Sequence, residues 1–337
     1  MADGPALLRA LCIGLAGAGL ASEAGLPAAP LIGSSVAVSA AAWAGLRLRM
    51  DPRLRNLGFL GIGLSLGSGI DPAALAQLGH WAVSLAGLVL SLAVTMGAGA
   101  WILRRHFGCD RGTAVLASSP GTMSYALAVA EDGGGDPVSV LTIQSLRLLV
   151  LASVLPVAVW LFVGEVPALA RSAADPLPLA VLAALGGGLG WLLARRRVPA
   201  AWLLGGFGVS ALAHGTGLAG GVLPWWVSFL CFGITGTTIG TRFSGLDARA
   251  LTRNLGAAVV VAAIASALSL VCAAVVARLT GLPLGQVWVA YAPGGVEAMA
   301  AIGLSLGYDP AYVALHHLVR IAVLVVMVPL FLRRTRS

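Results

Sequence analysis

Long apolar runs separated by short polar stretches make up most of the chain, and they fall into two sets of five. The first set predicts helices at roughly 6–21, 29–46, 56–70, 81–103 and 137–163. The second set predicts helices at roughly 177–194, 200–218, 225–240, 255–277 and 310–332. Most runs are long enough for a hydrocarbon core of about 30 Å, although the third run of each set is short.

A Pro-Gly element interrupts the apolar pattern between the fourth and fifth runs of each set. The two elements cover about 112–131 and 285–304, and they contain the motifs SSPG and YAPGG. Proline and glycine break a helix, so each element either crosses the membrane as a broken helix or dips in and returns as a re-entrant hairpin.

The two sets are copies of one unit. Pro120 recurs as Pro293, 173 residues later, and without a gap the same spacing links further identical residues. These pairs include Asp136 with Asp309, Pro137 with Pro310, Arg147 with Arg320 and Pro156 with Pro329. We therefore predict a first membrane repeat at 1–163, a linker at 164–176, a second repeat at 177–332 and a basic tail at 333–337. Duplicated halves are typical of transporters.

The composition indicates that this protein folds in a lipid bilayer. The chain of 337 residues is 58% hydrophobic and 10% charged, with a mean hydropathy of +0.94. Soluble domains carry about 25% charged residues. The expected fold class is therefore an all-α polytopic membrane protein. Its net charge of +8 comes from arginines in short clusters between apolar runs, which gives no nucleic-acid-binding pattern. The four cysteines show no metal-ligand spacing, so we expect no metal and no cofactor.

The arginine clusters decide between the two topologies. If both Pro-Gly elements are re-entrant and the N-terminus is cytoplasmic, 17 arginines lie inside and two outside. If both elements cross, the numbers become 13 and six. The positive-inside rule favours the re-entrant arrangement. Each half then makes an odd number of crossings, so the two halves form an inverted repeat with both termini cytoplasmic.

Two arginines and two hairpin tips are expected to meet at the middle of the membrane. Arg147 and Arg320 each lie ten residues into the fifth run, which is about 15 Å deep. A charge at that depth is costly and marks a candidate functional site. Guanidinium groups and helix N-termini both suit a carboxylate, so we predict a central anion site.

The remaining candidates belong to the two tips and to the same layer of the fifth runs. Gly121, Gly294 and Gly295 let the backbone approach a ligand closely. Gln144 and His317 occupy equivalent positions in one polar layer. His317 is expected to hydrogen-bond to substrate or to Glu297, and a proton relay is its alternative role. Hydroxyls for substrate or Na⁺ come from Ser118, Ser119, Thr122 and Ser124. The alternative for these hydroxyls is a bond to their own helix backbone.

Glu297 is the acid of the second tip, and Ser124 stands at its place in the first. Two roles are open. It either pairs with Arg320 or Arg147 as a counter-ion, or it titrates and couples transport to protons.

The motif Tyr291-Ala-Pro-Gly-Gly-Val-Glu-Ala-Met299 and the segment from Asp309 to Arg320 resemble the AbrB membrane family over nearly the whole chain. The family consists of duplicated bacterial membrane proteins that are often labelled ammonia monooxygenases or transcriptional regulators. The resemblance implies an inner-membrane location. The layout is also similar to the glutamate and citrate symporter folds, whose example implies a homodimer.

The sequence thus predicts a secondary transporter of a small, carboxylate-like anion, coupled to H⁺ or Na⁺. A membrane sensor or regulator is the alternative that the family name implies. A membrane monooxygenase, the enzyme reading, is disfavoured because no clustered ligands for an oxygen-activating metal are present.

Overall fold

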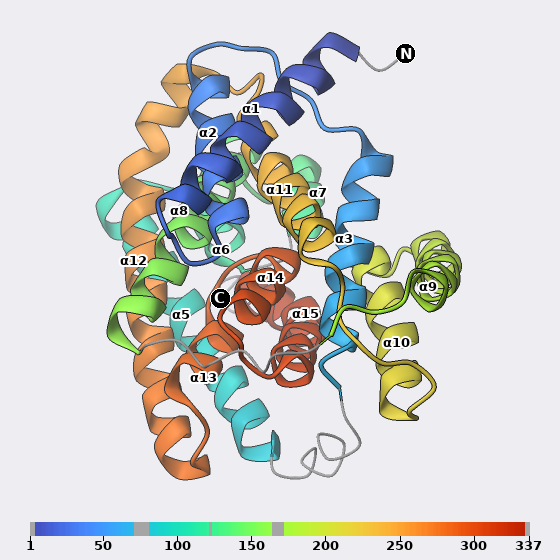
Figure 1. The fold of residues 1–337 in the computed structure, drawn as a ribbon. Coiled ribbons are helices and arrows are strands. Elements are labelled where there is room, and N and C mark those ends of the chain that lie inside the picture. Colours follow the sequence, from blue (N-terminus) through green and yellow to red (C-terminus); the bar gives the residue numbers. More distant parts are fainter. Residues whose placement is uncertain (1–3, 71–80, 121–122, 164–171, 334–337) are drawn as a thin grey trace.

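The computed structural model describes residues 4–70, 81–120, 123–163 and 172–333, and it is a bundle of α-helices (Figure 1). The first half contains α1 (Gly4–Glu23), α2 (Ala29–Trp43), α3 (Pro52–Gly67), α5 (Ala82–His106), α6 (Arg111–Ser118), α7 (Met123–Val129), a π-helical turn (Ala130–Gly134) and α8 (Pro137–Phe162). The second half contains α9 (Pro176–Arg195), α10 (Ala201–Gly215), α11 (Trp225–Thr241), α12 (Ala248–Thr280), α13 (Leu284–Tyr291), α14 (Val296–Ser305) and α15 (Pro310–Arg333).

This architecture confirms the all-α polytopic membrane fold. Six of the described helices are long and apolar enough to cross a membrane, namely α1, α5, α8, α9, α12 and α15. Large apolar side chains point outward from them, such as Leu20 at 74% and Leu177 at 76% exposure. Lipid is the medium in which such surfaces are stable, so the chain is a multi-pass membrane protein.

Helix by helix, the second half repeats the order and approximate lengths of the first. Differences from the predicted bounds are confined to helix ends, of which the largest is α12, with 33 residues against the shorter run expected at 255–277. Much of the predicted linker and nearly all of the basic tail lie outside the described residues.

Aspartates begin several of these helices. Asp136 and Asp309 each stand directly before a proline, and their carboxylates accept hydrogen bonds from the N–H groups of Val138 and Ala311 at 3.1 and 2.9 Å. This is the expected N-cap arrangement with proline in the first turn. It fixes the start of α8 and α15, the two helices that carry Arg147 and Arg320.

The two halves pack against each other through equivalent pairs of helices, α3 against α10 and α11 against α2. Gly63 on α3 lies against the backbone of Leu203 on α10, and Gly236 on α11 lies against the backbone of Leu31 on α2. Each contact is the repeat counterpart of the other. Such reciprocal contacts are the pattern of a two-fold relation between the halves.

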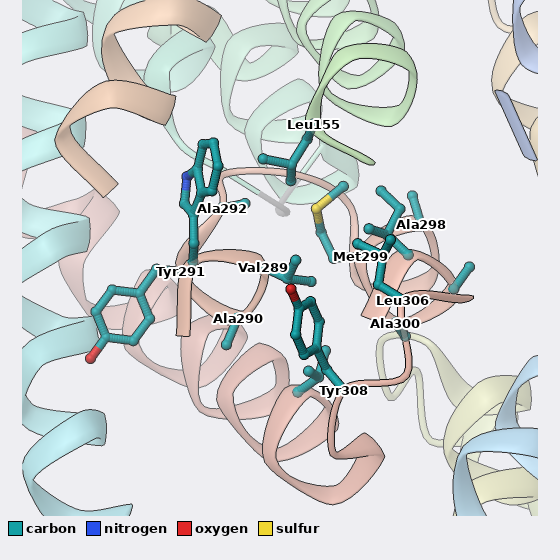
Figure 2. Packing of buried hydrophobic residues seen from close by; sticks show 14 of the residues in the cluster. Leu155, Val289, Ala290, Tyr291, Ala292, Ala298, Met299, Ala300, Leu306 and Tyr308 are labelled. Atoms are coloured by element: carbon teal, nitrogen blue, oxygen red, sulfur yellow. The ribbon is translucent and has the colours of Figure 1, made fainter. Parts of the chain in front are cut away.

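The interior is divided into hydrophobic clusters, and the largest one surrounds the second Pro-Gly element. In Figure 1 this element, α13 and α14, lies at the centre of the bundle beside α15. Figure 2 shows Val289, Met299 and Tyr308 directed toward one another within the cluster. A second cluster packs around α6 and the start of α8. Each broken element is thereby held in a mostly apolar surrounding.

Candidate functional site

The Pro-Gly elements break where proline dictates. α6 ends at Ser118 and α13 ends at Tyr291, and the next residues, Ser119 and Ala292, have extended ψ angles of 122° and 135°. Both precede a proline, whose ring disfavours the helical conformation of the residue before it. The chain therefore leaves the helix at the same point in both halves.

Each broken element returns to the place where it began. The N–H of Asp136 donates to the Thr113 hydroxyl at 2.7 Å, which joins the start of α8 to the start of α6. The N–H of Asp309 donates to the Gln286 side-chain oxygen at 3.1 Å, which is the equivalent bond in the second half. In both halves the start of the fifth long helix is therefore bonded to the first turn of the broken element at equivalent positions.

Arg147 and Arg320 hold the ends of the broken helices. The two terminal nitrogens of Arg147 donate to the carbonyls of Ala117 and Ser119, both at 2.9 Å. Those of Arg320 donate to the carbonyls of Ala292 and Gly294, both at 2.6 Å. Carbonyls at a helix C-terminus lack partners within the helix and carry partial negative charge. The forked guanidinium satisfies two of them at once.

Both arginines are buried, with 3% exposure for Arg147 and none for Arg320. Arg320 lies within electrostatic range of Arg147 and of Glu297, so the three predicted charges do converge. Their first structural partner, however, is the main chain of the tips. Of the two arginines, Arg147 also lines a cavity.

A cavity of about 400 Å³ lies beside the second tip. Its walls come from α3, α7, α8, α11, α15, the loop before α10 and the first turn of α14. Five of the predicted site residues line it: Gln144, Arg147, Gly294, Gly295 and Glu297. The residues singled out from the sequence therefore form one wall of this cavity.

Other predicted residues are placed elsewhere. Ser118 and Ser119 donate to the carbonyls of Ala114 and Leu116, at 2.7 and 2.8 Å, so their hydroxyls have the backbone bonds that were the alternative to a ligand. Arg320 and His317 are not among the lining residues. Gly121, Thr122 and the side chain of Ser124 lie outside the described residues.

The opposite wall comes from α11 and was not predicted. Thr235 and Thr238 line the cavity, and Arg242 follows at the end of the helix. The signal in the sequence is the polar run Thr-Gly-Thr-Thr at 235–238, inside an otherwise apolar helix. Each of the two threonine hydroxyls donates to a carbonyl of its own helix at 2.8 Å, and each keeps lone pairs that can accept a bond.

A larger vestibule of about 960 Å³ adjoins the cavity. The two spaces share the lining residues Phe59, Arg197, Ala200, Thr238, Arg242 and Glu297. Three further arginines, Arg47, Arg49 and Arg55, complete the vestibule wall. A solute that enters the cavity from the vestibule passes these charges.

Glu297 stands at the junction of the two spaces. Among the described residues, the one ion pair of 4.0 Å or less joins Arg253 to Asp136. No arginine nitrogen in that part of the chain therefore lies within 4.0 Å of the Glu297 carboxylate. Arg242 lies within electrostatic range of Glu297. The carboxylate is thus near several cations without a direct partner among them.

His317 differs from its repeat counterpart. Gln144 donates to the Leu116 carbonyl at 2.7 Å. His317 is fully buried, and neither ring nitrogen has a hydrogen-bond partner among the described residues. Among the described residues, no three or more His, Cys, Asp or Glu side chains lie close enough together to hold a metal ion.

Comparison with known proteins agrees with this architecture. The family described as "Transition state regulatory protein AbrB" matches residues 6–336. A Bacillus subtilis (strain 168) protein named "Uncharacterized protein YhjN" is 26% identical over 306 residues, which cover 84% of this chain and 79% of the relative. An Escherichia coli (strain K12) protein named "Putative regulator AbrB" is 26% identical over 301 residues, which cover 86% and 84%. The chain belongs to the AbrB family of membrane proteins.

Proposed function

We propose that this protein is a secondary active transporter of a small, carboxylate-like anion, coupled to H⁺ or Na⁺. It has no enzymatic role in this proposal. It acts as a homodimer in the bacterial inner membrane, with both termini in the cytoplasm.

The cavity at the second tip carries the proposal. Arg147, Arg197 and Arg242 face it against the single acid Glu297, so an anion is electrostatically favoured there. α14 begins at the same cavity, and its N-cap residue Gly295 supplies no side-chain cap. The first N–H groups of that helix therefore offer partial positive charge to an anion. Thr235, Thr238 and Gln144 add neutral polar groups.

The distribution of arginines supports the re-entrant, inverted topology. Arg47, Arg49 and Arg55 line the same vestibule as Arg197 and Arg242. A crossing arrangement would put the first three on the opposite membrane face from the other two. With re-entrant hairpins all five lie on the cytoplasmic face, as the positive-inside rule requires.

The asymmetry of the site supports alternating access. The cavity opens, through the vestibule, toward the membrane face that carries the arginine clusters. The repeat counterparts of its lining residues Thr235 and Gln144 are Ile62 and His317, neither of which lines the cavity or the vestibule. Two halves that can exchange these environments would open the site to each face in turn.

A membrane sensor or regulator is the second candidate, and it rests on the printed name of the Escherichia coli relative. Such a protein would bind the anion in the same cavity and release it to the same side. Flux across a membrane separates the two functions.

The test is uptake of labelled small carboxylates by proteoliposomes that contain the purified protein. Thr235→Val and Thr238→Val should each raise the half-saturating concentration about tenfold, because valine removes a hydroxyl that can turn from its helix carbonyl and donate to the anion. Thr95→Val is the matched control, since Thr95 is buried and makes the same backbone bond at 2.7 Å without lining the cavity. Saturable anion binding with no uptake would replace the transporter by a sensor.

The same vesicles identify the coupling ion. Uptake should respond to an imposed pH or Na⁺ gradient, and Glu297→Gln should abolish the response to the pH gradient if the carboxylate carries the proton. An unchanged response would leave Glu297 as a fixed charge at the cavity mouth.

A further inference from the structure

The vestibule concentrates positive charge well beyond what one small carboxylate needs. Five arginines line it, and they come from four separate segments of the chain: Arg47, Arg49, Arg55, Arg197 and Arg242. Among the lining residues that the structure describes, Glu297 is the one acid. Like charges gathered around one space repel one another, so an anion that enters is strongly stabilised.

Among the residues that the structure describes, these arginines form no ion pair of 4.0 Å or less. In the described chain the one ion pair is Arg253 with Asp136, which lies outside the vestibule. Arg55 donates to the amide oxygen of Asn56 at 3.2 Å, and Arg242 donates to the sulfur of Met123 at 3.4 Å. Both partners are uncharged. The guanidinium charge therefore remains available to a ligand.

The chemistry of this wall fits phosphate. Guanidinium forks bind phosphate oxygens in pairs, and several forks together favour a ligand with several negative oxygens. Asn56, Thr241 and Ser244 add neutral polar groups to the same wall. At about 960 Å³ the vestibule is also larger than the inner cavity of about 400 Å³.

We propose that the vestibule is a binding site for a ligand with at least two phosphate charges, separate from the inner anion site. The ligand is either a soluble polyphosphate or the phosphate headgroup of an anionic lipid, which present the same chemistry. Because Arg197, Arg242 and Glu297 belong to both spaces, a bound phosphate ligand covers the entrance of the inner cavity.

The experiment uses the purified full chain and two phosphate sources. Pyrophosphate is titrated calorimetrically into protein in nanodiscs of zwitterionic lipid. In a parallel arm, cardiolipin, an anionic lipid whose headgroup carries two phosphates, is introduced into the nanodiscs and its retention by the protein is measured by native mass spectrometry. Binding in the first arm identifies a soluble ligand, and retention in the second arm alone identifies a lipid headgroup.

Two matched pairs of variants test the location. Arg55→Gln and Arg197→Gln remove vestibule charges, whereas Arg53→Gln and Arg196→Gln remove exposed neighbouring arginines that do not line it. Each vestibule variant should weaken phosphate binding about tenfold, and each control should leave it within about twofold. Equal weakening in both sets, or binding in neither arm, would overturn the proposal. Uptake of the small anion is measured separately, so failure of this site and failure of transport are distinguishable.

Discussion

The two hairpin tips share a skeleton but differ at the cavity. Arg147 and Arg320 each donate to two carbonyls at the break, of which those of Ser119 and Ala292 are repeat counterparts. The N–H groups of Asp136 and Asp309 bond to equivalent positions at the start of each broken element. Only the second tip carries an acid, Glu297, at whose place the first tip has Ser124. The repeat conserves what holds a broken helix inside a membrane and varies what faces the cavity.

The third helices of the two halves show the same division. Gly63 and Gly236 make equivalent backbone contacts on α3 and α11. The cavity residues Thr235 and Thr238 of α11 correspond to Ile62 and Ser65 of α3. The halves thus differ at these positions of the cavity wall, while the close-packed glycines are the same in both.

The most decisive way to break the comparison is to show that the two hairpins lie on the same membrane face. Asp132 and Ser305 are exposed, repeat-equivalent positions after α7 and at the end of α14. In a background with Cys12 and Cys109 replaced by serine, Asp132→Cys should react with an impermeant maleimide only in permeabilised cells. Ser305→Cys should react in intact cells, because an inverted repeat puts the hairpin bases on opposite faces.

Each cysteine serves as the control for the other, because the two are equivalent by sequence and exposure. Labelling of both from one face would reject the inverted topology. The native Cys109 is the reason for the serine background, although burial, and then Asp110 and Asp136, raise the pKa of its thiol and slow its reaction.

The fold was largely readable from the sequence because it depends on local rules. Proline at 120 and 293 forces the preceding residue out of the helix, and aspartate before proline begins α8 and α15. Because equivalent residues lie 173 positions apart, a helix start or end predicted in one half also predicts its counterpart in the other half. Hydropathy alone did not locate the ends of α12, because its first turn, with Arg249 and Arg253, is helical but polar.

The site was readable only in part, because its second wall depends on packing between distant segments. The depth of Arg147 follows from counting along α8. Its bonds to Ala117 and Ser119 do not, since they require knowing that α6 lies beside α8. Likewise, Arg242 counts toward topology in the sequence and becomes a cavity residue only when α11 packs near the second tip.

The two arginines should differ in how much stability they supply. Arg320→Ala leaves the Gly294 carbonyl without its bond from the guanidinium, and leaves the Ala292 carbonyl with only its bond from the Gly294 N–H, in a fully buried place. The loss should be about 1–3 kcal/mol. Arg147→Ala also removes two bonds to main-chain carbonyls, but it does so beside a cavity that water can enter, so its loss of stability should be smaller. Thermal unfolding in detergent, followed by tryptophan fluorescence, should show the larger fall in midpoint for Arg320→Ala.

Arg253→Ala is the control for this pair. It breaks an exposed ion pair of 4.0 Å and should change the free energy of unfolding by less than about 1 kcal/mol. If Arg320→Ala unfolded at the same temperature as this control, the bonds to the tip would not hold the broken helix.

The smallest expected effect tests the packing that the two halves share. Gly63→Ala and Gly236→Ala each place a methyl group against main-chain atoms, within 3.0 Å of the Leu203 carbonyl carbon and the Ser35 nitrogen, respectively. Each should destabilise the protein by roughly 1–3 kcal/mol. The two values should agree, because the contacts are repeat counterparts. Gly188→Ala, with open space around its added carbon, should be neutral or stabilise α9 by up to about 1 kcal/mol. A large difference in destabilisation between Gly63→Ala and Gly236→Ala would mean that the two interfaces contribute unequally to stability. That result is expected if one interface moves during transport.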